Sequence, residues 1–203
     1  MSQPQVAVSH YDWARYVTQG RWVNYWHQLH LALEVKPNSV LIVGVGDSIV
    51  ADVLRGQGAQ VFTADFDLGL APDIAADVRR LPLQDNGIDL VICCQVLEHL
   101  PLADLGSTLT SLRAVARRRL IVSLPQRGRG WGFSLRLPAI GEWSRGGVLP
   151  ARTPHVFDGQ HHWELGAPGS RRRDLVRITN GQLAEARTFV DAADPYRRFF
   201  VWS

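Results

Sequence analysis

The sequence predicts a single α/β domain in which helices cover both faces of a mostly parallel sheet. Strand and helix patterns alternate along residues 39–125 at the spacing of strand–helix–strand units. Ile88–Cys94 is an apolar run, interrupted only by Asp89, between turn signals, as expected of a central parallel strand. The chain ends in two strand patterns that a short turn separates, which indicates an antiparallel pair. With 203 residues, 46% hydrophobic and 20% charged, the composition is that of an ordinary globular protein.

The elements follow one another in a regular order. Residues 9–34 repeat large apolar groups three or four positions apart, which predicts a helix with a break near Gly20. A buried strand then begins at Ser39 and runs into a glycine turn. The further elements expected in this half are a helix over 48–57, strands over 59–64, around 76–78 and over 88–94, a helix over 103–118 and a strand over 120–124.

The second half is less regular. Residues 126–169 are rich in glycine, proline and arginine and show no clear element, which is typical of a lid or an insertion that binds substrate. A helix is expected over 171–180, and the closing strands over 183–190 and 197–202. The chain therefore divides into an N-terminal helical cap (1–37), a binding core (38–125), a lid or substrate insertion (126–169) and a C-terminal helix with its strand pair (170–203).

Composition excludes several classes of protein. No segment has the apolar length of a membrane span, and the first residues lack a signal pattern, so we expect a cytoplasmic protein. Cys93 and Cys94, the only cysteines, are adjacent in an apolar run. They therefore cannot form a disulfide framework or a four-cysteine zinc site.

The turn formed by Gly44, Val45 and Gly46 is the first candidate for a binding site. It lies between a strand and a helix, where the backbone can approach a ligand closely. A dinucleotide-binding turn would carry a third glycine at the position of Ile49, so an NAD-dependent oxidoreductase is disfavoured. Asp65 ends the second strand, where a carboxylate can accept both hydroxyl groups of a ribose; the alternative is a turn carboxylate in solvent.

Four segments extend this pattern in order and spacing. They are VLIVGVGDSIVADVL (40–54), VFTADFD (61–67), AADVRRLPLQDNGIDLVICCQVLEHLP (75–101) and LIVSLP (120–125). Together they resemble the class I S-adenosylmethionine (SAM) dependent methyltransferases of the small-molecule, type 11-like branch. The resemblance implies a Rossmann-like fold with a seven-stranded, mostly parallel sheet and an antiparallel C-terminal strand. It also implies a SAM-dependent methyltransferase that acts on an O or N of a small molecule and leaves S-adenosylhomocysteine (SAH).

The resemblance further implies a set of cofactor-binding residues. The glycine turn would lie against the methionine and ribose, Asp65 would hold the ribose hydroxyls, Asp77 would meet the adenine amino group, and Gln95 would face the sulfonium. The full set is Gly44, Val45, Gly46, Asp65, Phe66, Asp77, Val78 and Gln95. The alternative for Asp77 is that it caps a turn before Arg79. Glu98 and His99 are expected to pack and cap, and no metal site is expected.

Two positions depart from the family pattern. The family has an acidic residue where this chain has Ile42, and a third glycine where it has Ser48. The acid normally orders the loop or binds the amino group of methionine, and Asp47 is the residue placed to substitute for it. A non-catalytic protein that binds a ligand through the same fold therefore remains an alternative.

A catalytic base is expected after residue 125, if the reaction uses one. The donor is already activated, so the protein mainly aligns the acceptor, excludes water and accepts a proton from a hydroxyl. HVFDGQHHWELG (155–166) offers His155 and His161, and a hydrogen-bonded packing histidine is the alternative for each. The spacing of this segment matches no structural zinc pattern.

The charge distribution bears on the partners. Residues 1–112 carry a net charge of −6 and residues 113–203 a net charge of +9. The acidic half suits a cationic sulfonium, and the basic half suits an anionic small-molecule acceptor. RWVNYWHQL (21–29), the FDG…HHWELG segment and the PYRRFFV end resemble bacterial methyltransferases of unassigned substrate, and this resemblance implies an acceptor related to glycans or natural products. The arginine runs 117–119 and 171–173 keep an RNA methyltransferase as an alternative, although no separate RNA-binding module is evident. The aromatic N-terminal helix has three alternatives: closing over the cofactor, packing in the core, or forming a homodimer surface.

Overall fold

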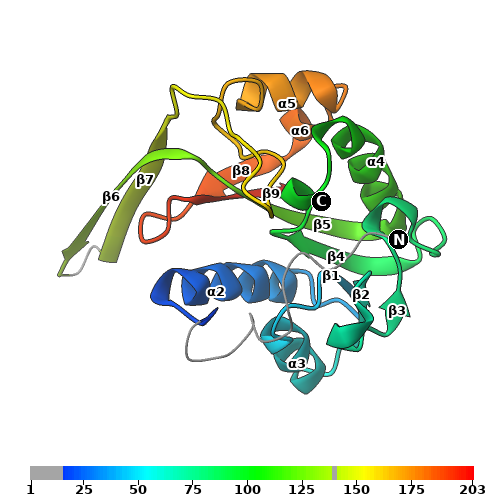
Figure 1. The fold of residues 1–203 in the computed structure, drawn as a ribbon. Coiled ribbons are helices and arrows are strands. Elements are labelled where there is room, and N and C mark those ends of the chain that lie inside the picture. Colours follow the sequence, from blue (N-terminus) through cyan, green and yellow to red (C-terminus); the bar gives the residue numbers. More distant parts are fainter. Residues whose placement is uncertain (1–15, 139–140) are drawn as a thin grey trace.

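The computed structural model describes residues 16–138 and 141–203 (Figure 1). Its main sheet has seven strands in the order β3-β2-β1-β4-β5-β9-β8. They are β1 (Ser39–Val43), β2 (Gln60–Asp65), β3 (Ile74–Ala75), β4 (Ile88–Cys94), β5 (Ala116–Pro125), β8 (Arg187–Val190) and β9 (Arg197–Trp202). Strands β1 to β5 pair in parallel, and β9 runs antiparallel to both of its neighbours. The expected sheet is confirmed.

Helices cover both faces of the sheet (Figure 1). The α-helices are α2 (Gln19–Glu34), α3 (Ile49–Gly56), α4 (Leu105–Val115), α5 (Arg172–Ile178) and α6 (Gln182–Glu185), and the short 3-10 helices are η2 (Leu68–Leu70), η3 (Val78–Arg80), η4 (Leu97–His99) and η5 (Leu102–Asp104). Successive strand residues point to opposite faces. In β1, Val40 and Ile42 therefore pack with α2 and α3, whereas Leu41 and Val43 pack with α4, α5 and α6. Burial on both faces explains why these strands are continuously apolar.

Several element boundaries differ from the expected ones. Helix α2 begins at Gln19, where the Thr18 hydroxyl accepts a hydrogen bond from the amide of Arg21, so the break precedes Gly20; residues 9–15 lie outside the described part. The strand expected around 76–78 is wrong: β3 lies at Ile74–Ala75. The first half of the strand expected over 183–190 is instead helix α6, and only 187–190 are extended.

The end of the helix expected over 103–118 is also wrong. Helix α4 ends at Val115, and Arg117 and Arg119 lie in strand β5. Ion pairs with residues distant in the sequence explain why Arg117 and Arg119 belong to a strand. The Nε of Arg117 lies 2.9 Å from the buried carboxylate of Asp89, and Nη1 of Arg119 lies 2.6 Å from Glu34. These arginines therefore tie the strand to its neighbours instead of completing a helix.

The segment 126–169, expected to lack clear elements, contains a β-hairpin. Strands β6 (Gly128–Leu137) and β7 (Gly141–Pro150) pair antiparallel in a sheet of their own, which projects from the main sheet (Figure 1). The sequence signal is the alternation of Trp131, Phe133, Leu135 and Leu137. The glycines at 128, 130 and 132 obscured this signal, because glycine is ordinarily depleted in strands.

No helix in the described ranges is long and apolar enough to span a membrane.

Candidate active site at the carboxyl ends of the strands

A cavity of about 700 Å³ lies at the carboxyl ends of β1, β2 and β4. The strand order reverses between β1 and β4, which is the point where open parallel sheets bind ligands. Eight residues expected to bind the cofactor line this cavity. They are Gly44, Val45, Gly46, Asp65, Phe66, Asp77, Val78 and Gln95.

The glycine turn after β1 has a backbone that side chains disfavour. Gly44 has φ 86°, and a Cβ atom there would lie 2.7 Å from Cγ2 of Val96. Ser48, where the family has its third glycine, adopts the same left-handed region with φ 60°. The turn has thus kept the conformation of a glycine-rich loop although one glycine is replaced.

Asp65 connects the end of β2 to the glycine turn. One carboxylate oxygen accepts a hydrogen bond from the amide of Val45 at 3.0 Å, and the other accepts one from the amide of Asp67 at 2.9 Å. Each carboxylate oxygen has a second lone pair. Asp65 can therefore order the turn and still accept hydrogen bonds from a ligand in the cavity.

A second carboxylate reaches the turn from Asp47. It accepts a short hydrogen bond from the hydroxyl of Tyr25, which belongs to helix α2. Burial and this contact raise the pKa of Tyr25, so the phenol keeps its proton. Ile42, which occupies the family's acidic position, is buried and apolar. Asp47 therefore places an acidic group on the cavity wall, where Ile42 supplies none.

Asp77 and Gln95 line the cavity and also have partners within the chain. The carboxylate of Asp77 accepts a hydrogen bond from the amide of Arg79 at 2.9 Å, and the guanidinium of Arg79 lowers the pKa of Asp77. Asp77 thus caps η3, as its alternative interpretation holds. Gln95 has φ 57° and donates its side-chain amide to the hydroxyl of Ser123 at 3.2 Å. Its amide oxygen is the acceptor that remains for a ligand.

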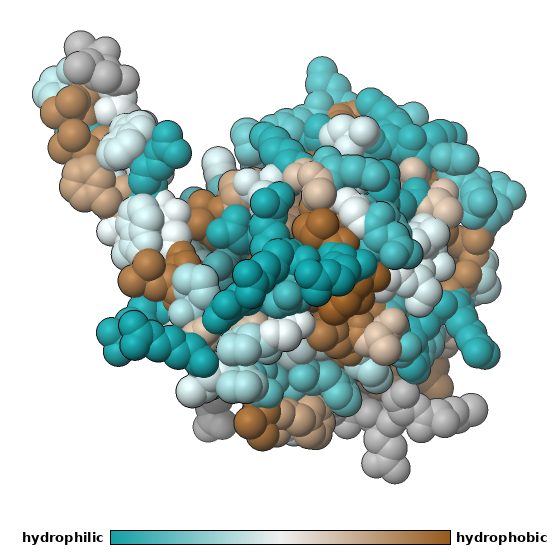
Figure 2. Space-filling view, turned by 90° about the horizontal axis from the view of Figure 1, so that it is seen from above, coloured by the Kyte–Doolittle hydropathy of each residue, from teal (hydrophilic) through white to brown (hydrophobic). Residues whose placement is uncertain are grey.

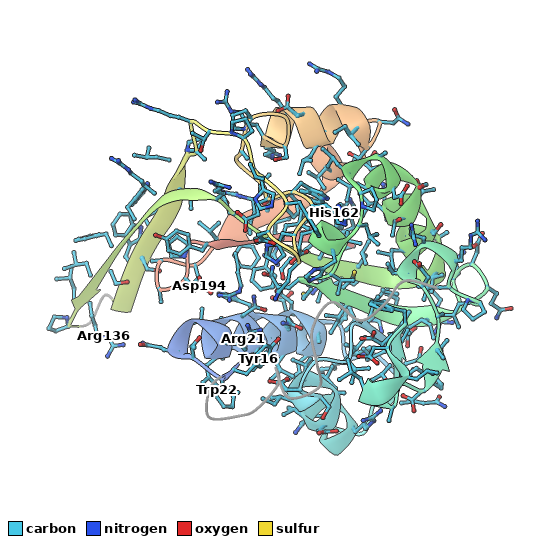
Figure 3. All side chains as sticks on the ribbon, viewed as in Figure 1. Tyr16, Arg21, Trp22, Arg136, His162 and Asp194 are labelled. Atoms are coloured by element: carbon cyan, nitrogen blue, oxygen red, sulfur yellow. The ribbon has the colours of Figure 1, made fainter. Side chains whose placement is uncertain are left out.

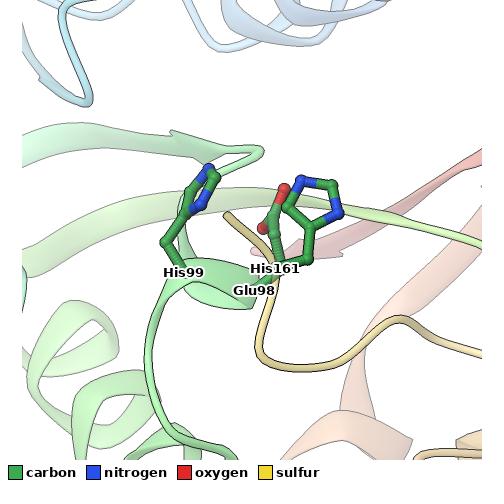
Figure 4. Close-up of side chains that lie close together, drawn as sticks. All are labelled: Glu98, His99 and His161. Carbon is green, nitrogen blue, oxygen red and sulfur yellow. The ribbon is translucent and has the colours of Figure 1, made fainter. Parts of the chain in front are cut away.

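Glu98 is a candidate site residue that the sequence analysis took for a packing and capping residue. Its side chain is fully buried, lines the cavity, and has no hydrogen-bond partner for either carboxylate oxygen among the described residues. Burial raises the pKa of Glu98 to about 7. Figure 4 shows it beside His99 and His161. The available signal was a carboxylate inside the apolar run VLEHL, directly after a central strand.

The segment expected to carry a base packs directly on the backbone of residues 98–100. The amide of His162 donates to the carbonyl of Glu98 at 2.9 Å, and the indole of Trp163 donates to the carbonyl of Leu100 at 3.1 Å. Nδ1 of His99 lies 3.0 Å from the carbonyl of Gln160. Residues 97–100 and 160–163 therefore form one wall of the cavity, although they are far apart in the sequence.

The two candidate histidines lie in different places. His161 lines the cavity, and its Nδ1 lies 3.0 Å from a carboxylate oxygen of Glu164, a contact that raises the pKa of His161. His155 is not part of the cavity lining. Its ring accepts from Arg127 at 3.2 Å and donates to the carbonyl of His161 at 2.8 Å. His155 thus holds the backbone of His161 in position.

Glu98, His99 and His161 also carry the donor types of a divalent-metal site. One possible ligand atom from each lies within 4.8 Å of the others. The contact with Glu164 engages Nδ1 of His161 and raises the pKa of that ring, so a metal bound at its other nitrogen would compete with a proton.

Helix α2 and the residue before it close the cavity on another side. Tyr16, Arg21, Asn24, Tyr25 and Gln28 belong to the lining. Figure 3 shows Tyr16 and Arg21 at the start of this helix and His162 on the segment above it. Trp22 and Trp26 are about half exposed and lie outside the lining. The described residues show helix α2 covering one side of the cavity, which corresponds to the first of its three alternatives.

Comparison with known proteins gives a family for the core and a fold for the chain. The methyltransferase domain family matches residues 41–120. No curated protein sequence is similar to the chain. A Pyrococcus horikoshii OT3 protein is similar in structure, with TM-score 0.61 and 11% identity over 98% of this chain and 96% of that one.

Two similar structures are methyltransferases. The magnesium protoporphyrin IX methyltransferase of Synechocystis PCC 6803 has TM-score 0.58 and 17% identity, over 90% of this chain and 82% of that one. The 1,6-didemethyltoxoflavin-N1-methyltransferase of Burkholderia thailandensis has TM-score 0.53 and 17% identity, over 99% and 92%. At such identities these likenesses show the fold. The chain therefore has the Rossmann-like fold of these methyltransferases, and its residues 41–120 match the methyltransferase domain family.

Proposed function

We propose that this protein is a SAM-dependent methyltransferase that methylates an O or N atom of a small molecule. One observation carries the proposal. A cavity of about 700 Å³ brings together the glycine turn, the carboxylate of Asp65 and the buried carboxylate of Glu98, for which residues 16–138 and 141–203 supply no hydrogen-bond partner. The Synechocystis enzyme, which shares the fold, has been crystallised with SAM and with SAH, which supports the choice of cofactor.

The residues of the cavity fit this cofactor. Its volume lies in the range of small-molecule sites, which is roughly 300–1,000 Å³. Asp65 has lone pairs for two ribose hydroxyls, and Phe66, which is 44% exposed, presents an aromatic ring next to it. Asp47 offers a carboxylate for the methionine amino group. When bound, SAM supplies a methyl group that a positively charged sulfur has already activated.

Glu98 is the group that we assign to proton transfer. A hydroxyl loses its proton as a lone pair on its oxygen forms the new bond to carbon, whereas an ammonium must lose a proton before its nitrogen has a lone pair for that bond. The carboxylate of Glu98 accepts that proton, since neither of its oxygens has a hydrogen-bond partner among the described residues and its pKa is about 7. The nearby charge of His161 stabilises the ionised form of Glu98. His155 acts as a positioning residue for His161.

The acceptor is proposed to carry a negative charge. Arg21 and Arg197 line the same cavity, the first from helix α2 and the second from strand β9. Arg197 pairs with Asp194, and the Nε of Arg21 donates to the carbonyl of Tyr16 at 3.0 Å. Both guanidinium groups have further N–H donors for a carboxylate or phosphate.

Calorimetric titration with SAH tests the cofactor assignment. We expect binding by the natural protein and a loss of about tenfold or more in the Asp65→Asn variant, because the neutral amide weakens charge-assisted hydrogen bonds to the ribose. Asp52→Asn is the matched control, since Asp52 is exposed on helix α3. Absence of binding by the natural protein at millimolar SAH would support the non-catalytic alternative, and equal binding by both variants would refute the role of Asp65.

The RNA methyltransferase alternative has less support. Two arginines of the 117–119 run are held in ion pairs with Asp89 and Glu34. These side chains are therefore partly neutralised and fixed. A steep salt dependence of binding to a generic RNA would restore the alternative.

A further inference from the structure

The β6–β7 hairpin has two unlike faces. Its register places Trp131 opposite Gly147, and Leu135 opposite Trp143. Residues directly opposite each other in a two-stranded ribbon point to the same face, and successive residues alternate. The odd-numbered residues of both strands therefore share one face, and the even-numbered residues share the other.

The even-numbered face packs against the loop between β8 and β9. A Cβ atom at Gly132 would lie 2.0 Å from the carbonyl oxygen of Ala192, and one at Gly146 would lie 2.7 Å from the Cα of Ala192. At Gly130 it would lie 2.8 Å from the ring of Tyr196. Glycine permits this close approach of backbones. The base of this face, at Gly130, Gly132 and Gly146, is therefore covered by the domain, whereas its outer part, with Ser134 and Ser144, is exposed. The odd-numbered face points away from the domain.

The odd-numbered face is apolar and exposed. Phe133 and Trp143 pack edge to face across the strands, with ring centroids 5.9 Å apart. We call its large apolar side chains, each between 41% and 61% exposed, the outer apolar stripe; they are Trp131, Phe133, Leu135, Leu137, Trp143 and Leu149. Figure 2 shows the hairpin as an arm with hydrophobic residues along it. Monomeric soluble proteins rarely leave such a stripe without a partner.

Arginine accompanies the stripe. Arg129 and Arg145 lie on the same face, and the guanidinium of Arg145 lies 5.7 Å from the centroid of the Trp143 ring. Residues 127–152 contain five arginines and one glutamate. Tryptophan and leucine combined with arginine are the composition of surfaces that lie in the interface of a membrane with anionic lipids.

The charges also decide between this partner and a second copy of the chain. A two-fold symmetric contact through the stripe would bring Arg129 and Arg145 of both copies into one apolar interface. Like charges would then lose water without gaining a counter-charge. Anionic headgroups supply that counter-charge. We therefore propose that the outer apolar stripe docks the protein reversibly onto the surface of an anionic lipid bilayer.

Co-sedimentation of the full chain with vesicles tests the proposal. One preparation is phosphatidylcholine alone, and the other replaces one third of it with phosphatidylglycerol. We expect binding to the mixed vesicles, about tenfold weaker binding to the neutral ones, and release by high salt. The double variant Trp131→Ser/Trp143→Ser should bind the mixed vesicles at least about tenfold more weakly, since two interfacial anchors are lost.

A matched double variant provides the control. Trp22→Ser/Trp26→Ser removes two tryptophans of similar exposure, 48% and 56%, from helix α2 and should bind vesicles like the natural protein. Near-ultraviolet circular dichroism confirms that each variant is folded. Equal loss in both variants, or no binding to anionic vesicles, would overturn the proposal. Sedimentation equilibrium that shows a dimer dissociated by the hairpin variant would assign the stripe to a second copy instead. None of these outcomes depends on methyl transfer.

Discussion

Replacing Glu98 by glutamine should stabilise the protein at neutral and alkaline pH. The natural carboxyl has a pKa of about 7 in the folded state, against an ordinary value of 4.5. The unfolded chain releases this proton at about pH 4.5 and the folded chain at about pH 7. Stability therefore falls as the pH rises between these values. A difference of about 2.5 pH units corresponds to roughly 3 kcal/mol, because one unit is worth about 1.4 kcal/mol.

Urea unfolding at several pH values between 4 and 8 measures this effect. At pH 4 the two proteins should have nearly equal free energies of unfolding, because the carboxyl is neutral in both states. At pH 8 Glu98→Gln should be the more stable by about 3 kcal/mol. Glu185→Gln, a change at an exposed surface ion pair, should show no such pH dependence. A stability difference that stays constant across the pH range would refute the assignment. The same variant should lose about 100-fold or more in methyl transfer.

Three further predictions concern the backbone, an ion pair and metal dependence. Gly44→Ala should cost about 2 kcal/mol in urea unfolding and weaken SAH binding, since it combines a left-handed backbone with a clash against Val96; adding Val96→Ala should restore part of the loss. Arg117→Ala should cost about 2 kcal/mol at pH 7, because it leaves the buried carboxylate of Asp89 with backbone donors alone. Arg117 lowers the pKa of Asp89, so the ion pair contributes to the free energy of unfolding above about pH 4, and this contribution is lost as the pH falls through the lowered pKa. If Arg117→Ala lowered the free energy of unfolding by the same amount at pH 3 as at pH 7, the pairing would be contradicted. Finally, activity should survive dialysis against EDTA, and loss that zinc or magnesium restores would show that the histidine cluster binds a metal.

The strands of the sheet could be predicted from the sequence because each is marked by the residues of the strand itself. Leu90–Cys94 and Phe199–Trp202 are continuous apolar runs, and the strands that contain them lie where they were expected. The arginines of β5 were misassigned because their partners are distant: Asp89 is 28 positions away from Arg117, and no local pattern records that pairing. The hairpin was missed for a related reason. Its glycines lower strand propensity locally, and their purpose becomes evident only against Ala192.

Some residues of the candidate site could likewise be predicted from local sequence, and others could not. Asp65 and the glycine turn follow directly from their places at the ends of strands, and the structure brings them together in the cavity. His155 and His161 have similar sequence contexts, but only the fold separates a residue that lines the cavity from one that holds a carbonyl. Glu98 was taken for a capping residue because neither its burial nor its lack of partners is visible in a single sequence.

The hydrogen bonds between residues 97–100 and 160–163 make the intervening chain a closed loop. Everything from Pro101 to Gly159, including helix α4, strand β5 and the hairpin, is inserted between two short segments that hold each other. Opening of one segment therefore releases the other, and the two should unfold locally as a unit. Hydrogen exchange would then find that the amide of His162 opens together with that of His99, and that a ligand in the cavity slows both to the same extent.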